Sequence, residues 1–101
     1  MVLTEHDRDD VRVQVWGDLD AMRAGDLRRE LARIAGGLVP RAMVVVDAAN
    51  LTFIDSAGVR ALEDCRRAVR GADGRFRLVA SEALRRLLQM SGMTELLVVD
   101  S

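Results

Sequence analysis

The sequence contains one cysteine, one histidine and no lysine among its 101 residues. A single cysteine, Cys65, excludes a disulfide within the chain, and its place on the apolar side of a predicted helix favours a small buried side chain. With one cysteine and one histidine, we expect no zinc site. His6 lies among charged residues near the N-terminus, so we expect it to be solvated and not to act as a catalytic base.

Sequence motifs for nucleotide binding and for serine hydrolysis are also missing. No GxGxxG or Walker sequence follows a predicted strand. Ser56-Ala57-Gly58 lacks the glycine two residues before the serine that a nucleophile elbow requires. We therefore expect a protein that is not an enzyme and that holds no cofactor, with hydrolysis through Ser56 kept as a further hypothesis.

Positive charge comes from arginine alone. The 15 arginines face 16 acidic side chains, which gives a formal net charge of −1. The doublets Arg28-Arg29, Arg66-Arg67 and Arg85-Arg86 lie on predicted helices among acidic neighbours, which indicates solvated helix faces. Binding to a phosphate backbone requires a stripe of uncompensated positive charge, so we expect no nucleic acid partner.

Long apolar segments are missing as well. No apolar run approaches the ~20 residues of a membrane span, and the charged N-terminal segment has no apolar core of signal-peptide length. We therefore predict a cytoplasmic protein that does not insert into a membrane. The length fits a single domain over residues 1–101.

The apolar pattern that is present predicts several strands. Residues 11–16 alternate apolar and polar side chains, as a half-buried strand does. Residues 42–46 are apolar at every position, which is typical of a strand covered on both faces. Further strands are predicted over residues 75–80 and 96–99, with an edge strand at residues 2–4.

Helices are predicted between these strands. The first begins near Asp20 and ends at Gly36-Gly37, the second spans about residues 57–70, and the third follows a cap at Ser81 and ends near residues 91–92. Strands that alternate with helices form a largely parallel sheet. We therefore expect an α/β fold with a mostly parallel sheet of four to five strands, flanked by about three helices.

Four carboxylates are expected where strands end. They belong to Asp18, Asp20, Asp47 and Asp55, and we expect them at the ends of the second and third strands. Caps and turns account for such residues, and a magnesium site at one edge of the sheet is the alternative. We predict no metal.

The most informative position is Ser56, where a predicted strand and its connection lead into a helix. A serine at a helix start can cap the helix by accepting a hydrogen bond from an amide two or three residues later. The same position offers partial positive charge and unpaired amides, which suit a phosphate group. The residues around Ser56 help to decide between these two interpretations.

These residues resemble the STAS family, the sulphate-transporter and anti-sigma-factor-antagonist domains. Gly17-Asp18-Leu19-Asp20 is similar to the Gly-Glu-Leu-Asp that follows the family's second strand, with Asp18 in place of glutamate. Residues 51–59, with the sequence LTFIDSAGV, look like the family's phosphorylation motif. Residues 75–79 resemble its next strand, and residues 84–93 resemble the helix and Ser-Gly segment before its final strand. The resemblance covers roughly residues 11–99.

The resemblance implies an anti-sigma factor antagonist. A partner kinase that is also an anti-sigma factor would phosphorylate the serine after the aspartate, here Ser56. The unphosphorylated form would bind the anti-sigma factor and so release a sigma factor. The phosphorylated form would not bind, and a serine phosphatase would restore it. The resemblance also leaves open an accessory STAS subunit of an ABC lipid-transport complex.

Asp20 and Asp55 are expected to shape the surface that binds the partner, and Gly58 is expected to allow close approach of the kinase or partner. Each has a structural alternative as a cap, a turn residue or a helix-packing position. Four apolar residues of the same segments are expected in the core, namely Phe53, Ile54, Met90 and Met93. Contact with a partner is the alternative for all four.

Overall fold

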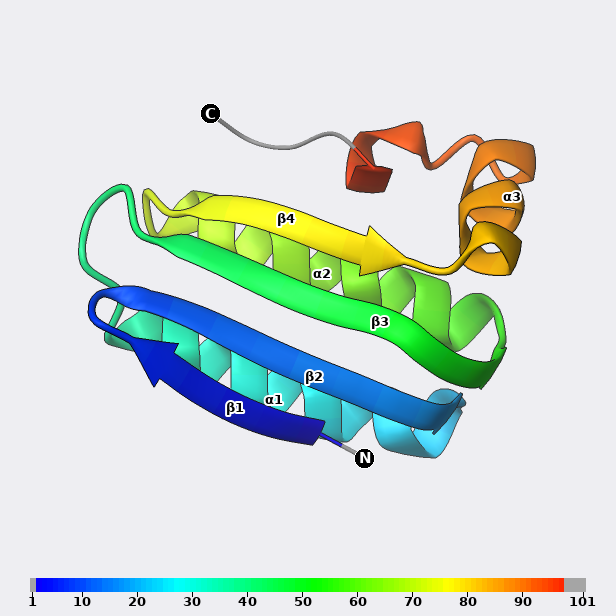
Figure 1. Cartoon of the computed structure of the whole chain (residues 1–101), viewed down its shortest axis with the longest axis horizontal. Coiled ribbons are helices and arrows are strands. Elements are labelled where there is room, and N and C mark those ends of the chain that lie inside the picture. The colour runs from blue at the N-terminus through cyan, green and yellow to red at the C-terminus, as the bar shows by residue number, and fades with distance from the viewer. Residues whose placement is uncertain (1, 98–101) are drawn as a thin grey trace.

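The computed structural model describes residues 2–97, in which strands and helices alternate (Figure 1). The strands are β1 (Val2–Asp7), β2 (Asp10–Leu19), β3 (Met43–Ile54) and β4 (Arg75–Ala80). The α-helices are α1 (Ala21–Gly36), α2 (Ser56–Gly71) and α3 (Glu82–Met90), followed by a short 3-10 helix, η1 (Thr94–Leu97).

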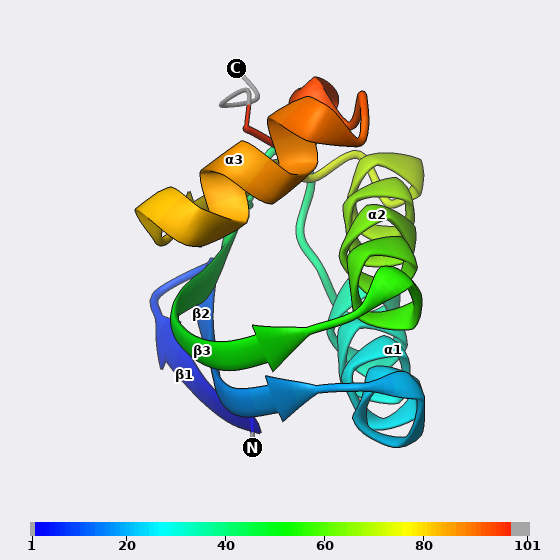
Figure 2. The same ribbon diagram turned by 90° about the vertical axis from the view of Figure 1, so that its right-hand side faces the viewer.

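The four strands form one sheet in the order β1-β2-β3-β4. β1 and β2 are an antiparallel hairpin, whereas β2 and β3, and β3 and β4, are parallel. The helices α1 and α2 connect the parallel strands and lie side by side on the same face of the sheet (Figure 2). The expectation of a mostly parallel α/β sheet with three helices is confirmed.

The core lies between this face of the sheet and the two helices. Alternate residues of β2 and β3 point into it, as the period of a strand requires. The helices contribute residues spaced three and four apart, which places these side chains on one face of each helix. Cys65 of α2 is among the buried residues, and burial raises the pKa of its thiol to about 12. The prediction of a buried, unreactive cysteine is therefore supported.

The opposite face of the sheet is free of helices across the described residues 2–97, and Figure 1 looks directly onto it. Met43 and Val45 of β3 point to this side and are half-buried, while Trp16 of β2 is 40% exposed. Residues 42–46 were expected to be covered on both faces. In the described part of the chain they are covered on one.

Several boundaries differ from those that the sequence predicts. β1 extends to Asp7, and β3 continues past residue 46 to Ile54 because it pairs with β2 along almost its whole length, with two register shifts. Leu96 and Leu97, expected in a final strand, lie in η1, and residues 98–99 of that strand lie outside the described residues. Across residues 2–97, no helix is both long and apolar enough to cross a membrane.

Candidate functional site

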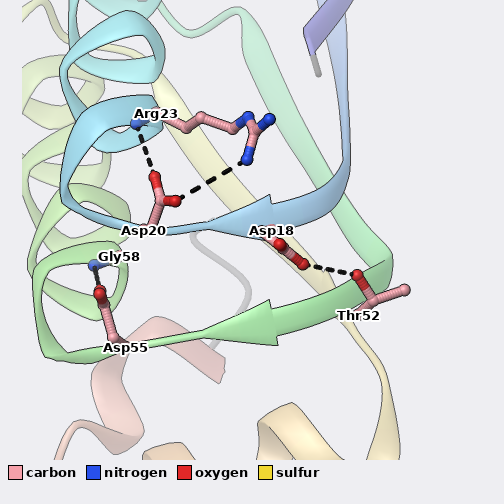
Figure 3. A network of polar contacts seen from close by, with 6 residues as sticks. All are labelled: Asp18, Asp20, Arg23, Thr52, Asp55 and Gly58. Carbon is pink, nitrogen blue, oxygen red and sulfur yellow. Dashed lines mark hydrogen bonds and ion pairs between the residues drawn. The ribbon is translucent and has the colours of Figure 1, made fainter.

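The first turns of α1 and α2 lie together at one edge of the sheet, and each is capped by an aspartate (Figure 3). The carboxylate of Asp55 accepts a hydrogen bond from the Gly58 amide at 2.9 Å. The carboxylate of Asp20 accepts one from the Arg23 amide at 3.0 Å and forms an ion pair with the Arg23 guanidinium at 3.8 Å. Leu19 at the end of β2 pairs with Ile54 at the end of β3. Asp20 and Asp55 are the residues that follow them, so the two aspartates lie at the ends of neighbouring strands.

Ser56 is the first residue of α2, and its side chain is exposed. It does not cap the helix. Asp55 has the extended backbone of a cap residue, with φ −110° and ψ −174°, and its carboxylate makes the capping bond. The interpretation of Ser56 as the cap is therefore wrong, and its hydroxyl is not required for holding the start of the helix.

The start of α2 provides a positive electrostatic environment for Ser56. The amides of Ser56 and Ala57 precede the first intrahelical hydrogen bond, so the helix itself offers them no acceptor. The N-terminal end of a helix carries partial positive charge, and the first turn of α2 contains no acidic residue. The nearest negative charge along the chain is the cap residue Asp55, one residue before the hydroxyl.

A hollow of about 310 Å³ opens beside Ser56. One wall comes from the end of β3 and the first turns of α2, and the other comes from α3 and the segment that follows it. The residues that line the hollow are Ile54, Asp55, Ser56, Val59, Arg60, Leu87, Ser91 and Met93. The segment that resembles the family's phosphorylation motif and the Ser-Gly segment lie more than 30 residues apart in the sequence, and they meet at this hollow.

Two of the four apolar residues near this hollow are not in the core. Ile54 and Met93 are partly buried and pack against the core, as expected. Phe53 is 53% exposed and Met90 is 86% exposed, so the expectation of burial is wrong for these two. Phe53 belongs to the last residues of β3, beyond the part of the strand that pairs with β4, and Met90 is the last residue of α3.

Arg60 is a site residue that the motif analysis misses. It lies four residues after Ser56 on α2, so the two side chains are neighbours on the helix surface, and both line the hollow. Two later arginines of the same helix, Arg66 and Arg67, donate to the carboxylate of Glu63 at 3.3 and 3.2 Å. Arg60 has no ion-pair partner within residues 2–97. The four-residue spacing between Ser56 and Arg60 can be seen in the sequence and would have placed Arg60 beside Ser56 on the predicted helix.

Gly58 is buried and has an internal role. A Cβ at this position would overlap the carbonyl oxygen of Leu19 and would lie 2.7 Å from Cγ1 of Ile54. The absence of a side chain therefore lets the first turn of α2 pack directly on the end of β2. Contact of Gly58 with a partner, which the sequence also predicts, stays a prediction.

The four carboxylates noted in the sequence do not assemble into one cluster. Asp18 accepts a hydrogen bond from the hydroxyl of Thr52 at 3.0 Å (Figure 3). Asp47 lies within β3, and there it forms an ion pair with Arg12. The expectation that Asp47 lies at the end of a strand is therefore wrong. In the part of the chain that the structure describes, no three histidine, cysteine, aspartate or glutamate side chains are placed to hold a metal ion.

The fold is similar to that of several solved proteins. The anti-sigma factor antagonist SpoIIAA in its unphosphorylated form matches with a TM-score of 0.79 and 23% identity, over 97% of this chain and 86% of the other. An anti-sigma factor antagonist from Mycobacterium paratuberculosis matches with a TM-score of 0.80 and 23% identity, over 96% and 81%. The Bacillus cell fate determinant SpoIIAA in its phosphorylated form matches with a TM-score of 0.74 and 22% identity, over 97% and 89%.

At these identities the similarity demonstrates a shared fold. No protein of curated function matches the chain. The family described as Mlab, STAS domain, matches residues 2–99, which is almost the entire chain. The chain belongs to the STAS domain family.

Proposed function

We propose that this STAS domain is an anti-sigma factor antagonist, a binding module and not an enzyme. Its unphosphorylated form binds an anti-sigma factor that is also a serine kinase, and thereby releases a sigma factor. Phosphorylation of Ser56 blocks this binding, and a serine phosphatase reverses it. The observation that carries the proposal is the exposed hydroxyl of Ser56 at the start of α2, beside a hollow that a partner can enter.

A phosphate on Ser56 is compatible with the fold. It adds about −1.5 to −2 charges and three acceptor oxygens. The N-terminal end of α2 stabilises negative charge by about 0.3–1 kcal/mol at an exposed position, whereas the carboxylate of Asp55 opposes it. Because the cap is made by Asp55 and not by Ser56, modification of the hydroxyl leaves the capping hydrogen bond intact. We therefore expect a switch that acts without refolding.

The same phosphate is unfavourable in an interface. The hollow beside Ser56 has apolar side chains on its walls, among them Val59, Leu87 and Met93. Removing a charged group from water costs several kcal/mol when new partners do not compensate it. A change of about 5.5 kcal/mol in relative affinity takes a complex from 99:1 to 1:99. Local charge is therefore of the right order to control binding.

Arg60 gives the phosphate a second effect in this proposal. In the unphosphorylated protein the guanidinium of Arg60 is available to an acidic group of the partner, because it has no ion-pair partner within residues 2–97. A phosphate on Ser56 lies one helical turn away and pairs with Arg60 itself. Phosphorylation then both adds negative charge to the hollow and removes a positive group from recognition.

The test is incubation with ATP and candidate anti-sigma factor kinases, followed by mass spectrometry. We expect a single phosphate, on Ser56. Ser56→Ala abolishes the modification, and Ser91→Ala, which removes another hydroxyl at the same hollow, leaves it unchanged. Phosphate on another residue counts against the proposal, and so does equal binding of the anti-sigma factor by Ser56→Ala and Ser56→Glu.

An accessory STAS subunit of an ABC lipid-transport complex is the second candidate. The exposed apolar side chains of Phe53 and Met90 favour it, because such side chains suit a constitutive protein interface. This candidate predicts stable co-purification with an ATPase subunit and no phosphate on Ser56. The first candidate predicts a complex that phosphorylation dissociates, so mass spectrometry of the purified complex separates the two.

A further inference from the structure

The sheet face opposite α1 and α2 carries a pattern that the proposed switch does not use. Residues 42–46 are apolar at every position, yet helices cover only one face of this strand within residues 2–97 (Figures 1 and 2). Met43 and Val45 point to the open side, and Leu3 of β1 is 48% exposed there. A strand that is apolar on both faces is typical of a sheet buried on both sides. The part of the open face that β3 forms therefore has the composition of a covered strand.

The strand register arranges the side chains of this open face in rows across the sheet. One row contains, from β1 to β4, Glu5, Arg12, Val45 and Arg77. The next row contains Leu3, Gln14, Asp47 and Val79. The first row is therefore acidic at the β1 edge and basic at the β4 edge, and the second row is apolar at both edges.

This arrangement is complementary to itself. A two-fold axis that lies between two facing sheets and runs parallel to the strands places β1 of one copy over β4 of the other and keeps each row in register. Glu5 then lies over Arg77 of the second copy, and Leu3 lies over Val79 of the second copy. The same axis repeats both contacts, because residues in a two-fold interface exchange roles. Neither Glu5 nor Arg77 has an ion-pair partner within residues 2–97.

The middle strands fit the same arrangement. β2 of one copy lies over β3 of the other, so the amide of Gln14 faces the carboxylate of Asp47 of the second copy. Asp47 already accepts from Arg12 in its own chain, and its side chain is 11% exposed, so it is a fixed acceptor at the centre of the face. Sheets that pack face to face keep their strand directions within about 30° of each other, which this axis satisfies.

We propose that the open face of the sheet binds a second copy of this chain, through a symmetric contact of sheet on sheet. Opposite charges at the two edges of one row and apolar side chains at the two edges of the next select a second copy over an unrelated partner. The Ser56 hollow lies between the end of β3, the first turns of α2, and α3 with the segment that follows it, not on this face. A dimer of this kind therefore presents two switch sites at once.

The size of the face sets the strength of the dimer. Four strands at ~4.8 Å spacing and about eight residues at ~3.3 Å rise give roughly 500 Å² for each copy. The total of roughly 1,000 Å² is at the lower end of specific interfaces. We therefore expect a reversible dimer that forms at micromolar to sub-millimolar concentration and weakens as salt screens its edge charges.

The experiment is sedimentation equilibrium of the full chain from about 5 µM to about 1 mM. We expect Glu5→Arg and Arg77→Glu each to raise the dissociation constant of the dimer roughly tenfold above that of the wild type, because the symmetric interface contains the contact twice. The double variant, in which the two charges are exchanged, restores the dimer. Arg85→Glu on α3 changes the charge by the same amount as Arg77→Glu, and we expect it to leave the dissociation constant of the dimer unaltered.

A second measurement locates the interface. In NMR spectra, the chemical shifts of the backbone amides of β1 and β4 are expected to change with protein concentration, whereas those of α1 are expected to stay constant. A wild-type chain that stays monomeric up to about 1 mM overturns the proposal and leaves this face for a partner of different sequence. A dimer that the exchanged charges do not restore overturns it as well, because the contact then lies on another surface.

Discussion

The backbone of Gly58 lies against the carbonyl oxygen of Leu19 so closely that no side chain fits between them. This contact joins the first turn of α2, which carries Ser56, to the end of β2. Asp20 follows β2 directly and caps α1. The two helix starts that border the candidate site are therefore fixed to each other by direct packing. Any change at Gly58 is expected to act on the fold before it acts on a partner.

The first prediction concerns Gly58→Ala. Its methyl group would overlap Leu19 and Ile54, and we expect a loss of about 1–3 kcal/mol in the free energy of unfolding. Gly25→Ala in α1 is the matched control, because a Cβ there meets only Arg29 at an ordinary 3.5 Å, and we expect it to stabilise by about 0.4–1 kcal/mol. Urea unfolding measures both. Equal stability of the two variants would contradict the packing role.

The second prediction separates the two roles of Asp55. Asp55→Ala removes the cap of α2 and is expected to cost about 0.5–2 kcal/mol, as is Asp20→Ala at the corresponding position of α1. Asp55→Asn keeps an oxygen acceptor and is expected to retain most of the stability. If Asp55 also contributes charge to recognition, Asp55→Asn weakens binding of the anti-sigma factor while the unfolding curve stays close to wild type. A loss of stability as large as that of the alanine variant would contradict the cap.

How far the sequence predicts this fold can be seen at the helix ends. The sequence predicts the helix ends at Asp20, Ser81 and the Gly36-Gly37 pair, because a cap depends on a few neighbouring residues. The sequence does not predict the extension of β3 to Ile54, because apolar and polar side chains do not alternate regularly over residues 47–54. That segment is a strand because it pairs with β2 across two register shifts, and such tertiary pairing overrides local preference.

The candidate site shows the same division. The sequence singles out Ser56 and Asp55 as candidates, because these residues lie together in one short motif, and that choice stays a prediction. It did not predict the far wall of the hollow, since the position of Met93 depends on how α3 and the segment after it pack. It also expected Phe53 and Met90 to be buried. Their exposure is set by where a strand and a helix end, which is the least predictable feature of an element.

The third prediction concerns acid stability. The carboxylate of Glu30 accepts hydrogen bonds from Arg33 at 2.9 and 2.8 Å and from the hydroxyl of Thr4, which ties β1 to α1. These bonds, those from Arg33 first, lower the pKa of Glu30 from its ordinary 4.5 to about 2. Because the folded pKa is depressed, the stabilisation is fully present above about pH 4.5 and is lost as the pH falls towards 2.

We therefore expect Glu30→Gln to be less stable than wild type at pH 7, and the difference to shrink between about pH 4.5 and pH 2. Urea unfolding over this pH range measures it. Glu82→Gln, which removes an exposed carboxylate that pairs with Arg86 on α3, is the control and is expected to show little change. A difference between Glu30→Gln and wild type that stays constant with pH would rule out this account.

The fourth prediction uses the buried thiol as a probe. Burial raises the pKa of Cys65 to about 12, so little thiolate exists at pH 8. We expect a disulfide reagent to modify the native protein roughly a thousandfold more slowly than an exposed cysteine. Ser56→Cys in a Cys65→Ala background provides that comparison, because position 56 is exposed. Equal reaction rates of the two cysteines would contradict this prediction, because the thiol of Cys65 would then be no better protected than a thiol at position 56.

The central claim is that the charge on one side chain controls partner binding. Protein with phosphoserine incorporated at position 56 during synthesis allows a direct test that does not depend on finding the kinase. Its affinity for the anti-sigma factor that binds the unmodified protein is then measured by titration calorimetry. The account predicts an affinity lower by at least about a hundredfold, approaching ten-thousandfold for a complete switch, with an unchanged circular dichroism spectrum. Equal affinities of the phosphorylated and unmodified proteins would contradict it.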